Sequence, residues 1–266
     1  MRLMLLGTQG WIPTPRRETT CLAVYDDDVL FVFDAGTGLG RFLQSPAADL
    51  LDGTREVHLF LTHYHLDHVC GLAYLPGIFK DRQLLVHVPE AGLNGVDPEH
   101  GVPDLIRKPF NPGGFHEHPN FQLQVMREGD NTVATHVVRL RAQCHPDTTV
   151  AYRLDDCLVL ATDTVADAQT ATFAQGARVL LHEAWLDGVE EGDPTQREFV
   201  EASYKAHSSA RQVARIAADA GVTDLVLIHL NPLRDEAYYG QMERAARETF
   251  EATHVYPDLH ELDLEG

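Results

Sequence analysis

Four side chains that can bind metal ions occupy six consecutive positions of this sequence, 63–68. The segment follows the largely apolar run 57–61 and reads Thr62-His63-Tyr64-His65-Leu66-Asp67-His68. In an extended chain alternate side chains share a face, so His63 and His65 can bind one ion together. Asp67 and His68 stand where the chain would turn into a helix, and they can bind a second ion. The spacing therefore predicts two metal ions.

The sequence contains fifteen histidines, and most of them are expected to be structural or exposed to solvent. One histidine alone would therefore not indicate a metal site. Three histidines and an aspartate at the end of one apolar strand form a much more specific pattern. We interpret this cluster as a metal site rather than as a chance grouping.

The His-x-His-x-Asp-His pattern resembles the signature of the metallo-β-lactamase superfamily of dinuclear metallohydrolases. The resemblance implies further ligands at the ends of apolar strands, and three residues occupy such positions: His145, Asp163 and His229. By this resemblance the ligands of one metal are His63, His65 and His145. Those of the other metal are Asp67, His68 and His229, and Asp163 bridges the two ions.

Such a centre implies hydrolysis, with a metal-bridging hydroxide as the nucleophile. Two ions roughly 3.5–4 Å apart lower the pKa of a shared water and stabilise both the attacking and the leaving oxygen. The resemblance also implies that Asp67 is one of the catalytic residues. Imidazole and carboxylate ligands without thiolate favour Zn²⁺, and Mn²⁺ or iron are also compatible. Relatives with redox activity usually have a carboxylate in place of His65 and a flavin domain, and this sequence has neither.

Two motifs in the second half resemble the ribonuclease Z branch, which also includes small phosphodiesterases and arylsulfatase-like enzymes. They are His182-Glu183-Ala184 and His207-Ser208. By this resemblance His207 protonates the leaving oxygen as a general acid, and Glu183 orients or polarises it. The alternative for His207 is a surface or helix-capping residue.

The N-terminal region resembles the same branch in Gly7-Thr8-Gln9-Gly10 and in the Asp-x-Gly motif that begins at Asp34. Asp34 would orient a ligand histidine. Arg16 and Arg17 are candidates for binding a phosphate or sulfate, because guanidinium groups match such oxyanions. The alternative for these arginines is a solvated turn.

Two features favour a small anionic substrate, such as a phosphodiester, over a long nucleic acid. The formal charge is −19, which opposes the binding of a polyanion. Ribonuclease Z enzymes typically carry a long arm that grips tRNA between the equivalents of His145 and Asp163. Only 17 residues separate these two positions here, enough for two short strands and a turn.

The leading hypothesis is thus a dinuclear metal-dependent phosphodiesterase of the ribonuclease Z-like branch. Three alternatives stay open. The same centre could open lactones or thioesters or cleave aryl sulfates, it could process the 3′ end of tRNA, or the chain could be a non-catalytic binding protein of this fold. A homodimer is implied by the resemblance alone.

Composition and patterning predict one α/β domain over residues 1–266, of which 44% are hydrophobic. Its class by resemblance is the αββα four-layer sandwich of the metallo-β-lactamase type. No apolar run is long enough to span a membrane, and residues 1–7 are too short for a signal peptide. The four cysteines form no close pair, which favours a reducing, cytoplasmic location.

The apolar segments predict strands, and helical spacing predicts two later helices. Ser208 is expected to cap a helix that ends at Gly221, and another helix is expected over 236–251. Residues 91–120 are rich in proline and glycine, and they are either a flap over the metals or a solvated loop. The predicted strands are 1–6, 21–25, 29–34, 57–61, 84–88, 121–126, 133–140, 149–154 and 157–161.

Overall fold

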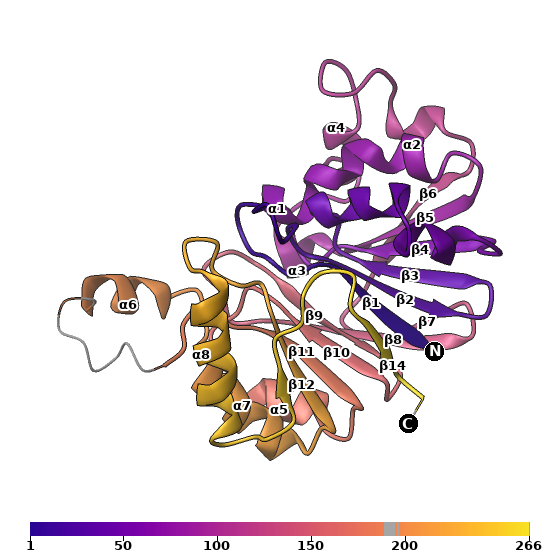
Figure 1. Ribbon diagram of the computed structural model, residues 1–266. Helices are drawn as coiled ribbons and strands as arrows, with labels where there is room; N and C mark the ends of the chain where they lie inside the picture. The colour runs from indigo at the N-terminus through magenta and orange to yellow at the C-terminus, as the bar shows by residue number, and fades with distance from the viewer. Residues whose placement is uncertain (189–194, 196, 266) are drawn as a thin grey trace. The chain divides into compact units, whose positions relative to one another are not determined.

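The computed structural model describes residues 1–188, 195 and 197–265, and the chain divides into two compact units. The first unit comprises Met1–Thr8, Ile12–Arg127 and the chain from Pro257 onward, and the second comprises Gln9–Trp11 and Glu128–Tyr256. Each unit contains one mixed sheet of seven strands with helices beside it (Figure 1). Two mixed sheets flanked by helices are the elements of the predicted fold class, which is confirmed. The single domain over 1–266 stays a prediction.

The sheet of the first unit has the strand order β14-β1-β2-β3-β4-β5-β6. Strands β3 to β6 are parallel to one another, whereas β1 pairs antiparallel with β14 and β2, and β2 pairs antiparallel with β3. The carboxyl ends of β3 and β4 therefore meet at one edge of the sheet. The bounds are β1 Arg2–Gly7, β2 Cys21–Asp26, β3 Val29–Phe33, β4 Glu56–Phe60, β5 Gln83–Pro89, β6 Phe121–Met126 and β14 Glu261–Asp263.

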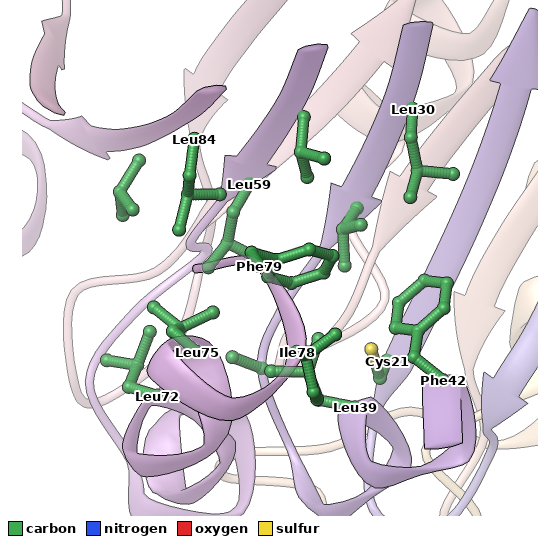
Figure 2. Close-up of a cluster of buried hydrophobic side chains, with 14 of the residues drawn as sticks. Cys21, Leu30, Leu39, Phe42, Leu59, Leu72, Leu75, Ile78, Phe79 and Leu84 are labelled. Atoms are coloured by element: carbon green, nitrogen blue, oxygen red, sulfur yellow. The ribbon is translucent and has the colours of Figure 1, made fainter. Parts of the chain in front are cut away.

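One face of this sheet buries alternate apolar residues against short helical segments. Leu59 of β4 and Leu84 of β5 lie in the same cluster as Leu72, Leu75 and Phe79, as Figure 2 shows. The period of two in the strands brings these side chains to one face. The helical segments are α1 (Leu66–Val69), α2 (Leu75–Ile78) and 3₁₀ turns at Thr37–Leu43, Ala47–Leu51 and Cys70–Tyr74. This packing fixes the chain on both sides of the 63–68 loop.

The sheet of the second unit has the order β13-β12-β11-β10-β9-β8-β7. Strands β7 to β10 are antiparallel, and β10 to β13 are parallel. The bounds are β7 Gly129–Val133, β8 His136–Ala142, β9 Val150–Leu154, β10 Leu158–Ala161, β11 Val179–Glu183, β12 Asp224–Ile228 and β13 Thr253–His254. Helices α5 (Ala168–Ala174), α7 (Ala210–Ala220) and α8 (Glu236–Arg247) lie beside this sheet (Figure 1). They contribute side chains to one core cluster with β10, β11 and β12. Helix α6 covers Arg197–Ser203.

Most predicted elements are present, and three details were wrong. The strand predicted over 133–140 is a hairpin of β7 and β8, and β7 was missed because its sequence, Gly-Asp-Asn-Thr-Val, has few strand-forming residues. Helix α7 is capped by Ser209, not Ser208, through a capping box with Gln212. Helix α8 ends at Arg247 rather than at 251.

The segment 91–120 is more ordered than its composition predicts. It contains α3 (Ala91–Asn94), α4 (Gly101–Leu105) and a 3₁₀ turn at Phe115–Glu117. Val102 and Phe115 are buried in the core cluster of the first unit, whereas Phe110 is 74% exposed. The segment is therefore anchored rather than solvated throughout, and a role as a flap stays a prediction.

We compared the helices of the described residues with the requirements of a transmembrane span. None of them combines the length and the apolar character that a transmembrane span requires.

A buried histidine pair joins the neighbouring strands β4 and β5. His58 Nδ1 lies 2.8 Å from His87 Nε2, and the ring of His87 stacks on Phe60 with 4.5 Å between centroids. Burial, and then the charge of His58, lower the pKa of His87 from 6.5 to about 3. His87 is therefore neutral in the folded protein at pH values at which the unfolded chain binds a proton there.

This difference makes the unfolding free energy fall as the pH drops from 6.5 toward 3. We expect His87→Gln to reduce the slope of stability against pH in that window by about 1.4 kcal/mol per pH unit. Urea unfolding of the metal-free protein between about pH 6 and pH 4 measures the slope. His116→Gln, at an exposed position, is the matched control. An unchanged slope in His87→Gln would contradict the assignment.

Candidate metal centre

The loop after β4 brings together the four predicted ligands of the first unit. The ring centroid of His63 lies 4.5 Å from that of His65 and 4.3 Å from that of His68. Asp67 Oδ2 lies 3.4 Å from His68 Nε2. The first unit therefore presents three imidazoles and a carboxylate as one group.

Asp34 organises this group from the end of the neighbouring strand β3. Its carboxylate is fully buried, and Oδ2 accepts a hydrogen bond from His68 Nδ1 at 2.8 Å. Oδ1 accepts the backbone N–H of Thr62 at 2.8 Å, which ties down the start of the ligand loop. Because Nδ1 of His68 engages Asp34, His68 must bind a metal through Nε2. This contact is the one that the predicted orienting role of Asp34 requires.

In the second unit, three side chains offer ligand atoms that all lie within 4.8 Å of one another: Asp163, His207 and His229. His229 Nε2 lies 3.3 Å from Asp163 Oδ2. Asp163 follows β10 and His229 follows β12, so the two parallel strands around β11 deliver their ligands to the same edge. The sequence indicated His207 as a general acid and gave no sign that it could also be a ligand.

Backbone strain marks the same strand ends in both units. Asp34, Asp163 and His229 have positive φ angles of 59°, 49° and 49°. Residues other than glycine seldom adopt this left-handed conformation, and strained residues cluster at functional sites. The turn after each strand redirects a side chain that the regular strand would have pointed elsewhere.

His145 is a predicted ligand that does not belong to this close group of three. It sits in the loop between β8 and β9, where Asp147 N donates to its Nδ1 at 3.1 Å. Its ring centroid is 6.2 Å from that of His207. Within the described part of the second unit, the close group of three ligands does not include His145, and its role as a ligand stays a prediction.

Glu183 is a buried carboxylate that holds two of the histidines. Its Oε2 lies 2.8 Å from His207 Nδ1 and 3.5 Å from His229 Nδ1. Its Oε1 accepts the backbone N–H groups of Thr164 at 3.0 Å and Ser208 at 3.1 Å. Burial alone would raise the pKa of Glu183, but the charge and hydrogen bond of His207, and those of His229, outweigh it and lower the pKa. Glu183 is therefore ionised and orients both rings.

Gly10 of the N-terminal motif packs directly on His229. Gly10 N donates to Leu230 O at 3.0 Å, and the Gln9 side chain donates to the same oxygen at 2.9 Å. A Cβ atom at position 10 would lie 2.6 Å from Cε1 of His229, so only glycine fits. The motif resemblance at 7–10 thus corresponds to a physical support for a predicted ligand.

The two candidate substrate-binding arginines differ in exposure. Arg17 is 3% exposed, and its Nη1 donates to Thr8 Oγ1 at 2.7 Å. Arg16 is exposed at the surface of the same unit. The contact of Arg17 favours a structural role for it, whereas phosphate binding by Arg16 stays a prediction.

Both groups of donors suit a divalent metal ion. Each combines imidazole nitrogens with carboxylate oxygen, and in each a carboxylate fixes a ring through Nδ1. This support from outside the ligand set is typical of metal-binding histidines. The residues therefore fit the ions that the sequence predicts, and their chemistry suits Zn²⁺, Mn²⁺ or iron.

Asp34→Asn tests the support of His68 while keeping the shape of residue 34. Asparagine tolerates positive φ, so the turn after β3 should survive. Loss of the charge should weaken metal binding by roughly 10–100-fold, measured by competition with a chromogenic chelator. Asp28→Asn, which alters an exposed ion pair with Arg55, should leave the affinity unchanged. Equal metal affinities in Asp34→Asn, Asp28→Asn and the parent protein would refute the role of Asp34.

Gly10→Ala tests the close packing on His229. The added methyl group must displace the imidazole, so the bound metal should fall below the stoichiometry of the parent protein. Gly77→Ala is the matched control, because a Cβ at position 77 meets nothing within 4 Å. Metal analysis after dialysis measures both variants. Full metal content in Gly10→Ala would show that His229 is not required in its observed position.

Comparison with known proteins identifies the family. The model of the metallo-β-lactamase superfamily matches residues 14–198. Ribonuclease Z of Thermoplasma acidophilum is 26% identical over 317 aligned positions, which cover 99% of this chain and 96% of the relative. The alignment is longer than this chain of 266 residues, so the relative contains segments that this chain lacks.

Solved structures agree with this result at the level of the fold. The metallo-β-lactamase fold protein YhfI of Bacillus subtilis is similar with a TM-score of 0.75 at 17% identity, over 98% of both chains. The short form of human tRNase Z is similar with a TM-score of 0.69 at 15% identity, over the full length of both chains. The predicted family is thereby confirmed: the chain belongs to the metallo-β-lactamase superfamily, and its relatives place it in the ribonuclease Z-like branch.

Proposed function

We propose that this protein is a metal-dependent phosphodiesterase that acts on small substrates and uses His207 as its general acid. The observation that carries the proposal is the 2.8 Å contact between Glu183 and His207, in the same group as Asp163 and His229. A carboxylate-oriented imidazole beside metal ligands is suited to protonate a leaving oxygen. The similarity to ribonuclease Z, an enzyme named for its action on RNA, supports phosphodiesters as the substrate class.

In this proposal the chain holds two divalent ions, with zinc as our first choice. The proposed ligands are those that the family resemblance implies: His63, His65, Asp67, His68, His145, Asp163 and His229. When bound, the ions supply Lewis acidity and a water that is activated near neutral pH. His207 is adjacent to this group, and in this proposal it acts as an acid rather than as a ligand, so His207→Ala should keep its full metal content.

In this proposal, residues around His207 determine which of its protons is transferred to the leaving oxygen. Glu183 accepts the Nδ1 proton of His207, so the proton that leaves is the one on Nε2. A buried carboxylate stabilises the imidazolium form that donates it. Transfer of this proton to the leaving oxygen avoids the expulsion of an alkoxide. The backbone N–H groups of Thr164 and Ser208 hold Glu183 in place while this occurs.

The proposal of a small substrate is based on the segment between His145 and Asp163. As predicted, this region contains only β9, β10 and a turn, which leaves no room for a tRNA-gripping arm at that position. The net charge of −19 also opposes a long polyanion. We further propose a cytoplasmic location, in keeping with four free cysteines.

The test is turnover of bis(p-nitrophenyl) phosphate by protein loaded with zinc or manganese. Asp67→Asn and Asp163→Asn should lower kcat by roughly 10²–10⁴-fold, because each removes a proposed metal ligand. His207→Ala should keep its metal and lose less activity, because this leaving group needs little protonation. His254→Ala, at a partly exposed position on β13 outside the proposed ligand set, is the control. Absence of turnover with both metal sites filled would overturn the proposal.

A second comparison addresses the size of the substrate. Cyclic nucleotides, dinucleotides and a precursor tRNA with a 3′ extension are supplied at equal concentration to the active metal form. We expect kcat/KM to be higher for the small phosphodiesters. A clear preference for the precursor tRNA would instead make the chain a tRNA-processing enzyme without the usual arm.

A further inference from the structure

Trp185 stacks on the imidazole that the proposed reaction needs. The ring centroids of Trp185 and His207 lie 4.4 Å apart, and the ring planes differ by 12°. Trp185 is 8% exposed, and its centroid lies 5.7 Å from that of His229. The indole therefore covers one face of His207 and also reaches the ligand beside it.

The backbone fixes this stack from both sides. Trp185 N donates to Ser208 O at 2.9 Å, and Ala210 N donates to Leu186 O at 2.8 Å. The chain that follows β11 is thus hydrogen-bonded to the chain that carries His207. Trp185 also packs in a small cluster with Leu186 and Val200, so the indole has little freedom to move.

A hydrogen bond and a stack constrain different motions of the imidazole. The hydrogen bond from Nδ1 to Glu183 restrains rotation of the ring about its Cβ–Cγ bond at one point, and a single contact leaves part of that rotation possible. A broad aromatic plane parallel to the ring opposes this rotation, because tilting loses contact with the indole. Together the two contacts fix the direction of Nε2, the atom from which the proton leaves.

We propose that Trp185 is a positioning residue for proton transfer by His207, holding the imidazole plane by parallel stacking while Glu183 holds Nδ1. This proposal rests on the proposed function and adds a residue to it. Its consequence is selective: loss of Trp185 should affect substrates in proportion to their need for a proton on the leaving oxygen.

The experiment compares two diesters that differ in their leaving group. Bis(p-nitrophenyl) phosphate releases a stable anion, whereas diphenyl phosphate releases a stronger base that needs protonation. For Trp185→Leu, which keeps an apolar side chain but removes the planar ring, we expect kcat on diphenyl phosphate to fall by roughly tenfold to a hundredfold. On bis(p-nitrophenyl) phosphate we expect a change of about twofold or less, with KM nearly unchanged on both.

Three further variants distinguish a positioning role of Trp185 from a general loss of structure around it. Trp185→Phe restores a plane and should recover most of the rate on diphenyl phosphate. In a His207→Ala background, Trp185→Leu should have no further effect, because the residue it positions is gone. Phe199→Ala removes an aromatic side chain that packs against the same cluster, and it should not show the leaving-group selectivity.

The outcomes distinguish this inference from the function on which it rests. If metal-loaded parent protein cleaves neither diester, the proposed function fails, and the role of Trp185 fails with it. If the parent is active but Trp185→Leu slows both diesters equally, or adds to His207→Ala, only the positioning role is overturned. Trp185→Phe without rescue would also contradict it, and metal analysis confirms that each variant keeps its ions.

Discussion

Two buried carboxylates, Asp34 and Glu183, organise the loops that carry the predicted ligands in the two units. An ionised carboxylate without solvent is costly unless hydrogen-bond donors surround it. Asp34 satisfies this need with Thr62 and His68, and Glu183 does so with Thr164, Ser208 and His207. The same bonds that stabilise each charge fix the loop backbone and the plane of a histidine. The geometry of the functional side chains follows from this requirement.

The sheets place these carboxylates where they are needed. Asp34 follows β3 and Glu183 ends β11, and each strand is parallel to the neighbour that carries a ligand, β4 or β12. Parallel neighbours end at the same edge, so a carboxylate from one strand reaches the loop after the next. Positive φ angles at Asp34, Asp163 and His229 complete the arrangement by turning each side chain out of its strand. Strain at three sites is tolerated because the surrounding hydrogen bonds determine the conformation.

In the second unit, three separate contacts restrain the position of His207. His207 is bound at Nδ1 by Glu183, stacked on Trp185 and held at its backbone N–H by Ser203 O at 2.8 Å. In the proposed reaction, a side chain so fixed loses little entropy when it donates its proton, which is the physical basis of preorganised catalysis. Gly10 adds a further constraint on the neighbouring ligand by leaving space only for the ring of His229. The proposed function therefore depends on these supporting contacts as much as on the predicted ligands.

The sequence by itself determined the family, the alternating strands, and the ligand loop at 63–68, because motif spacing and strand periodicity are local properties of the chain. It also indicated Asp34, Glu183 and His207, although only through resemblance. Only the tertiary structure decided that Arg17 is buried against Thr8, that His207 lies among metal-binding groups, and that Gly10 and Trp185 pack on His229 and His207. The polar strand β7 likewise forms because β8 pairs with it. Such contacts join residues far apart in sequence, and no local pattern encodes them.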